Sequence, residues 1–169
     1  MNRVVDLHGC ILPAVLGPQG PQTMAESVKM IKSLAEQGIT DIFSTPDVTV
    51  SMDMNTWDEM ETTLNDVKLA VGEQQVDVTI HGGARVLLCD EMIEYIASHR
   101  NQYLLGNSHF MLVSIPENSK VHHINAWLLA LLNMEIIPII SEVETHRQLF
   151  TKPEPVSYTH LRAHETVLD

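Results

Sequence analysis

Short apolar runs alternate along this chain with longer segments in which apolar residues recur every three or four positions. Short apolar runs bounded by turn formers are typical of buried strands, whereas the wider spacing is typical of amphipathic helices. We expect five strands, one within Val4–Pro13 and the others at Ile39–Ser44, Val76–Ile80, Phe110–Ile115 and Ile136–Ile140. Four helices are expected between them, at Met24–Gln37, Trp57–Val71, Glu91–Ser98 and Ile124–Asn133.

Polar residues mark the expected starts of three helices. Thr23 with Glu26, and Thr56 with Glu59, have the T-x-x-E spacing of a capping box. In a capping box, the first side chain accepts from the backbone of the fourth residue, and the fourth side chain accepts in return. Asp90 is expected to cap the third helix in the simpler way, through its carboxylate.

The alternation of strands and helices predicts the fold class. Mostly apolar strands separated by helices favour an α/β fold, in which helices cover a parallel sheet. Five strands are compatible with an open doubly wound sheet or with part of a barrel. A complete (β/α) barrel takes about 250 residues, so 169 residues would form an incomplete one.

The charge balance excludes several classes of partner. Ten basic and 22 acidic residues give a formal charge of -12, which argues against non-specific binding to nucleic acid or to anionic lipid. No apolar run approaches the length of a membrane span, and the N-terminus does not resemble a secretory signal. The two cysteines, Cys10 and Cys89, form no C-x-x-C pair. We therefore expect a cytoplasmic domain.

The last segment does not read as part of the fold. From Val156 the sequence V-S-Y-T-H-L-R-A-H-E-T resembles one reading frame of a transposase adapter used in sequencing libraries. We expect one domain over residues 1–155 and an artefactual or disordered tail over residues 156–169. The natural sequence would then stop near Pro155, and His160 and His164 would carry no function.

Polar side chains follow every expected strand. They are Asp6, His8 and Cys10 at the first strand, Asp47 after the second, His81 and Arg85 after the third, Ser114 at the end of the fourth, and Glu142 and Glu144 after the fifth. In a parallel sheet these points share one edge, so the side chains are expected to converge. His, Cys, Asp and Glu are all metal ligands, which favours a metal site. The alternative is that these loops are polar only because they face water.

Several motifs resemble those of a known family. They are D-L-H-G-C-I-L-P at Asp6–Pro13, T-M-A-E-S at Thr23–Ser27, Q-G-I-T at Gln37–Thr40, S-T-P at Ser44–Pro46, G-A-R-V at Gly83–Val86 and I-P-I-I at Ile137–Ile140. They occur in order, between Val4 and about Arg147. The chain resembles the polymerase-and-histidinol-phosphatase (PHP) family, in particular the bacterial tyrosine-protein phosphatases of capsule and exopolysaccharide loci.

The resemblance implies a PHP-type distorted (β/α) barrel with parallel strands and helices outside, here incomplete. It also implies a cluster of manganese ions that hydrolyses phosphotyrosine, with metal-bound hydroxide attacking phosphorus. The implied partner is a tyrosine-phosphorylated protein, such as a bacterial tyrosine autokinase.

Only two of the implied metal ligands, Asp6 and His8, match the family pattern. Five positions depart from it: Cys10, Asp47 and Glu142 replace histidines, and Arg85 and Ser114 replace glutamates. A fixed positive charge about 4 Å from a divalent ion costs several kcal/mol even at an effective dielectric near 20. Arg85 is therefore the most damaging departure.

Three functions follow as hypotheses. The chain is a metal-dependent tyrosine phosphatase by descent, a degenerate member that binds a phosphoprotein or kinase through a phosphate contact at Arg85, or an α/β binding module that has lost the family's role. We expect no hydrolysis of phosphotyrosine. One remodelled ion on His8, Cys10, Asp47 and Glu142 is a further alternative, and its Cys and His would favour zinc.

Overall fold

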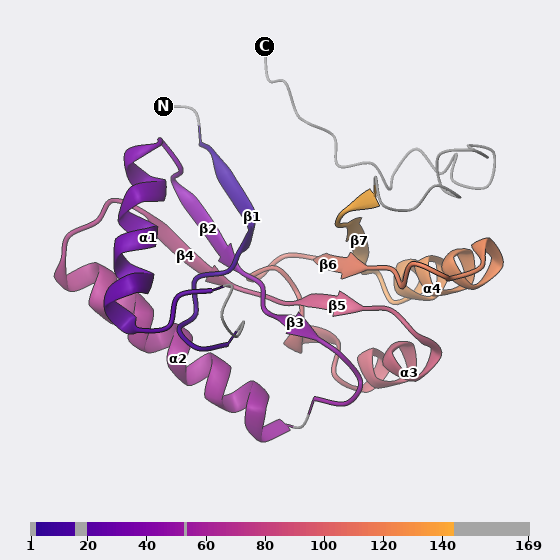
Figure 1. The fold of residues 1–169 in the computed structure, drawn as a ribbon. Coiled ribbons are helices and arrows are strands. Elements are labelled where there is room, and N and C mark those ends of the chain that lie inside the picture. Colours follow the sequence, from indigo (N-terminus) through magenta and orange to yellow (C-terminus); the bar gives the residue numbers. More distant parts are fainter. Residues whose placement is uncertain (1–2, 16–19, 53, 144–169) are drawn as a thin grey trace, which may run out of the picture.

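The computed structural model describes residues 3–15, 20–52 and 54–143, and its strands form two parallel sheets (Figure 1). The first sheet has the order β1-β2-β4, with β1 at Val5–Gly9, β2 at Asp41–Ser44 and β4 at Thr79–Gly82. The second has the order β3-β5-β6-β7, with β3 at Asp47–Val48, β5 at Arg85–Leu87, β6 at Phe110–Ser114 and β7 at Ile137–Ile140. The expected α/β class with parallel strands is confirmed.

Each sheet has its own pair of helices. Helices α1 (Met24–Glu36) and α2 (Met54–Glu73) pack on the first sheet, and α3 (Asp90–Ser98) and α4 (Val121–Asn133) pack on the second (Figure 1). A short 3-10 helix, η2 (Arg100–Gln102), follows α3. The described residues form two hydrophobic cores, one on each sheet, and α2 contributes to both, with Val67 and Val71 in the first and Trp57 in the second.

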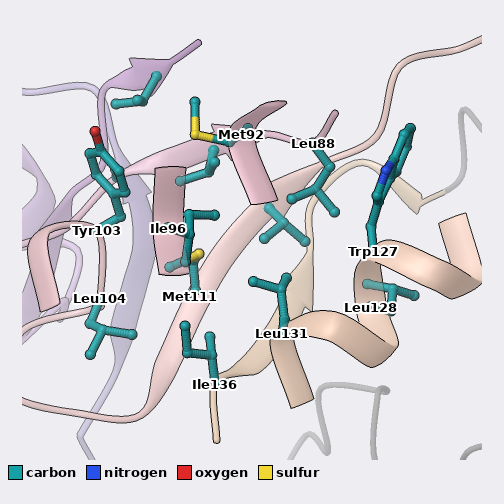
Figure 2. Packing of buried hydrophobic residues seen from close by; sticks show 14 of the residues in the cluster. Leu88, Met92, Ile96, Tyr103, Leu104, Met111, Trp127, Leu128, Leu131 and Ile136 are labelled. Carbon is teal, nitrogen blue, oxygen red and sulfur yellow. The ribbon is translucent and has the colours of Figure 1, made fainter. Parts of the chain in front are cut away.

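The core of the second sheet is the larger one. Figure 2 shows side chains of α3, β6 and α4 meeting in it, among them Met92, Met111 and Leu131, all of which are buried. Trp127 lies at its margin and donates from Nε1 to Asp90 Oδ1 at 2.6 Å, which joins α4 to the start of α3.

One of the expected helix starts is confirmed and two are wrong. Thr23 Oγ1 accepts from the Glu26 backbone, and the Glu26 carboxylate accepts from the Thr23 backbone, as a capping box requires. Thr56 starts no helix, because α2 already begins at Met54. Asp90 is no cap either: Cys89 holds the cap position, and the Asp90 carboxylate accepts from Trp127 instead.

All strands were expected to belong to one sheet and to end at the same edge. They form two sheets instead. After β2 the chain breaks at Thr45 and Pro46 and continues as β3, and after β4 it breaks at Gly83 and Ala84 and continues as β5. Both continuations pair in the second sheet. These strands of two and three residues are too short to leave a hydrophobic pattern. The third expected strand, Val76–Ile80, is also displaced and forms later, as β4.

Predictions for residues 144–169, including Glu144 and the tail from Val156, lie outside the described residues.

A charged cluster holds the start of the first sheet. The buried Asp41 carboxylate, at the first residue of β2, accepts from Arg3 Nε and Nη2, from Thr40 Oγ1 at 2.8 Å and from His81 Nε2 at 3.0 Å. The bonds from Arg3 and then from His81 hold the pKa of this carboxyl well below its usual range. A buried carboxylate requires such partners, because burial alone disfavours its charge.

Asp41→Asn is expected to lower the free energy of unfolding by about 1–3 kcal/mol at pH 7, because charge-assisted bonds are lost. Because the pKa of Asp41 is lower in the folded state, the ionised carboxylate stabilises the fold at pH values above its unfolded-state pKa, near 4. This contribution is lost as the pH falls from there through the folded-state pKa. The difference in the free energy of unfolding between wild type and Asp41→Asn should therefore become smaller at acidic pH. Urea unfolding at pH 7 and pH 3 measures it, with Asp66→Asn on the exposed face of α2 as a neutral control. An equal gap at both pH values would contradict this.

Gly9→Ala is expected to destabilise the fold by about 1–3 kcal/mol through overpacking. A Cβ at Gly9 would lie 2.5 Å from Ile42 Cγ2 and 3.1 Å from the Phe43 carbonyl oxygen. The matched control is Gly72→Ala in α2, where a Cβ meets no atom within 4 Å. That change should instead stabilise the helix by about 0.5–1 kcal/mol. Thermal unfolding of both variants tests the opposite signs.

Candidate functional site

Residues from three strands and one loop form the candidate site. His8 lies in β1 with Cys10 directly after it, Asp47 lies in β3, and Arg85 lies in β5. Glu142 follows β7 and has a positive φ of 52°. The convergence expected for these five residues is therefore found, although they come from both sheets.

Arg85 is the centre of this cluster. The parallel register pairs Asp47 with Arg85, so both side chains leave the sheet on the same face. Arg85 Nε donates to Asp47 Oδ1 at 2.5 Å and Nη2 donates to Oδ2 at 2.9 Å, which makes the pair bidentate. On the other side, Nη1 lies 3.2 Å from Glu142 Oε1. The bond from Asp47 raises the pKa of Arg85 above its ordinary value, so its positive charge is permanent.

The two carboxylates are more exposed than the guanidinium between them. The Arg85 side chain is 16% exposed, against 47% for Asp47 and 60% for Glu142. The bidentate geometry with Asp47 is the strong form of such a pair, whereas the contact of Arg85 with Glu142 is longer and more exposed to solvent.

Thr45 orients the histidine of the site. Thr45 Oγ1 donates to the Leu7 carbonyl at 3.2 Å, so its oxygen accepts from His8 Nδ1 at 2.9 Å. This pattern assigns the proton to Nδ1 and leaves a lone pair on His8 Nε2. Burial, and then the charge of Arg85, lower the pKa of His8, which favours the neutral form of the ring.

Cys10 lies beside this ring as a thiol. Its Sγ is 3.9 Å from His8 Nε2, and burial, followed by the negative charge of Asp47, raises its pKa. Metal binding requires the thiolate, which this environment disfavours. Asp6, the other residue that matches the family pattern, accepts from the His8 backbone through Oδ1 at 2.9 Å.

This donor arrangement does not fit a cluster of metal ions. Arg85 engages both Asp47 and Glu142, and the raised pKa of Cys10 favours its thiol over the thiolate. Within residues 3–15, 20–52 and 54–143, no group of three or more His, Cys, Asp or Glu side chains is arranged to hold a metal ion.

Of the other expected members of the site, His81 lies elsewhere, and the Ser114 side chain makes no hydrogen bond to the site among the described residues. His81 was expected to converge with the others, but its ring stacks on Phe43 with centroids 4.5 Å apart and bonds to Asp41 at the opposite end of β2. Ser114, at the end of β6, pairs with Leu87 in the sheet register. Thr45 is the residue that sequence reasoning missed. The S-T-P motif containing it was noted, but nothing there indicated that it would orient His8.

The fold defines the class of protein. A solved chain from the crystal structures of YwqE from Bacillus subtilis and CpsB from Streptococcus pneumoniae, described as unique metal-dependent tyrosine phosphatases, superposes with a TM-score of 0.74. The identity is 22%, over 89% of this chain and 60% of the solved chain. The expected PHP-type fold is therefore confirmed.

The sequence defines the family. A family model of capsular polysaccharide synthesis proteins, CpsB/CapC, matches residues 4–164, so the chain belongs to that family. It is 26% identical over 148 residues to CapC, a candidate tyrosine-protein phosphatase of Staphylococcus aureus. The match covers 86% of this chain and 56% of CapC, so the chain spans little more than half the length of this relative. Among the described helices, none is long and apolar enough to cross a bilayer.

Arg85→Met is expected to raise the pKa of His8. The change removes a positive charge that lowers this pKa and leaves Asp47, Glu142 and Asp6, all of which raise it. The pKa is measured by NMR titration of the imidazole resonances, with His8→Gln used to assign the signal. Arg100→Met, which removes a charge outside the site, should leave the value unchanged. A His8 pKa that stays constant or falls in Arg85→Met would refute the electrostatic account.

Proposed function

We propose that this chain is a capsule-associated member of the tyrosine phosphatase family whose phosphatase site is impaired. The observation that carries the proposal is the bidentate bond between Arg85 and Asp47, with Glu142 on the far side of the guanidinium. The similarity to tyrosine phosphatases supports descent from that family, and the ion pairs of Arg85 support the loss of its phosphatase activity.

The argument for impairment is electrostatic. A guanidinium occupies the position where the family resemblance implies a carboxylate that would bind manganese. It repels divalent ions and neutralises the two nearest acids, which would otherwise attract them. A single zinc ion on His8, Cys10, Asp47 and Glu142 is opposed by the same contacts, because two of those four groups are bound to Arg85.

A second candidate function is non-catalytic recognition of a tyrosine-phosphorylated protein. One contact favours it: the exposed Glu142 places Oε1 3.2 Å from Arg85 Nη1, a position that a phosphate oxygen could take instead. Arginine suits such a group, because its donors match phosphate geometry. A bacterial tyrosine autokinase in the cytoplasm is the partner that the resemblance implies.

The full chain, supplied with manganese, is expected to hydrolyse neither p-nitrophenyl phosphate nor a phosphotyrosine peptide above the rate without protein. The physical reason is that Arg85 disfavours the cation cluster on which this chemistry depends in metal-dependent enzymes. A colorimetric phosphate assay measures the rate. Manganese-dependent turnover that a chelator abolishes would contradict the proposal.

Peptide binding separates the two candidates. Fluorescence anisotropy with a labelled phosphotyrosine peptide should show binding only if the second function holds, and Glu142→Gln should then strengthen it while Arg85→Met removes it. The unphosphorylated peptide is the matched control. A peptide affinity that is unchanged in both Glu142→Gln and Arg85→Met would rule out recognition at this site.

A further inference from the structure

A cavity lies outside the candidate site, between α2 and the segment that joins η2 to β6. Its volume is about 300 Å³, at the lower end of the range for small-molecule sites. The ends of β2 and β4 form its floor, through Ser44, Gly82 and Gly83. None of His8, Cys10, Asp47, Arg85 and Glu142 lines it.

The floor contains a buried hydroxyl without a partner. Ser44 is 1% exposed, and its Oγ has no hydrogen-bond partner among the described residues. It lies on the same face of β2 as Ile42, which packs under α1 and α2, so its side chain is directed to the side of the sheet where the cavity lies. An unsatisfied buried hydroxyl is unfavourable, and a hydrogen bond with a ligand hydroxyl at this position would satisfy it.

The absence of a side chain at Gly82 keeps the floor open. A Cβ there would lie 3.2 Å from Leu64 Cδ2, and Leu64 is itself part of the cavity wall. Leu12 and Leu104 also line the cavity, and the three leucines offer apolar surface on which the C–H face of a ring could pack.

The rim is polar and carries no net charge. Glu61, Asn65 and Lys68 lie at positions i, i+4 and i+7 of α2, so they share one helix face. Asn101, from η2, and Asn107, from the segment that follows it, also line the cavity. Each amide offers two donors and an acceptor, which matches neighbouring hydroxyl groups that both donate and accept.

We propose that this cavity binds a small, neutral, polyhydroxylated ligand of the monosaccharide class. The amides and the Ser44 hydroxyl provide mixed donors and acceptors, and the leucines provide the apolar wall. One cation and one anion on the rim leave no excess charge for a phosphate or a carboxylate. The ligand class is therefore set by hydrogen bonding rather than by charge.

The test is isothermal titration calorimetry of the full chain with glucose, galactose and N-acetylglucosamine, each added alone. At least one should bind saturably. Asn65→Ala and Asn107→Ala should each weaken that binding about tenfold or more, whereas Asn118→Ala, an exposed amide outside the cavity, should leave it unchanged.

Ser44→Ala separates binding from folding. Because the hydroxyl has no intramolecular bond to lose, its removal should leave thermal stability equal or higher while the sugar affinity falls several-fold. Absence of saturable binding for all three sugars would overturn the proposal. Binding that survives both amide substitutions and Ser44→Ala would overturn it too, because the sugar would then sit elsewhere.

Discussion

The bidentate ion pair between Arg85 and Asp47 is the interaction on which the rest of this site depends. It forms because β3 and β5 run parallel with these two residues in register. The pair fixes one carboxylate, and its guanidinium also lies 3.2 Å from Glu142 Oε1 and, after burial, is the second cause that lowers the pKa of His8. The carboxylates of Asp47 and Glu142, which could otherwise bind a metal ion, are thereby neutralised by the guanidinium of Arg85.

The break between the two sheets explains how this pair arises. The chain leaves the first sheet after Ser44 and after Gly82 and re-pairs in the second sheet within three residues. His8 therefore approaches from the first sheet, and Asp47 and Arg85 approach from the second. Thr45, at the break, bonds to both Leu7 and His8 and so holds the two parts of the site together. The same break leaves the cavity floored by Ser44, Gly82 and Gly83 on the helical side.

The sequence predicted the elements that carry a strong local signal. The capping box at Thr23 and the alternation of parallel strands with helices could be read directly, because both depend on spacing along the chain. The short strands β3 and β5 could not, since their pairing depends on contacts with a distant sheet. The role of Asp90 was missed for the same reason: its partner, Trp127, lies 37 positions away.

For the site, the residues that converge were predictable but their pairing was not. Parallel-strand geometry brings His8, Cys10, Asp47, Arg85 and Glu142 to one place. Whether Arg85 would repel a metal ion or bind the neighbouring acids depends on register, which the sequence pattern does not specify. The position of His81 was mispredicted because its strand extends past it, and its ring lies against Phe43 and Asp41.

The most direct test is the manganese content of the full chain after equilibrium dialysis against manganese, measured by elemental analysis beside Arg85→Glu. The account predicts that the wild-type chain retains no stoichiometric manganese, because the guanidinium already neutralises the site. Two or more tightly bound ions per wild-type chain would contradict it.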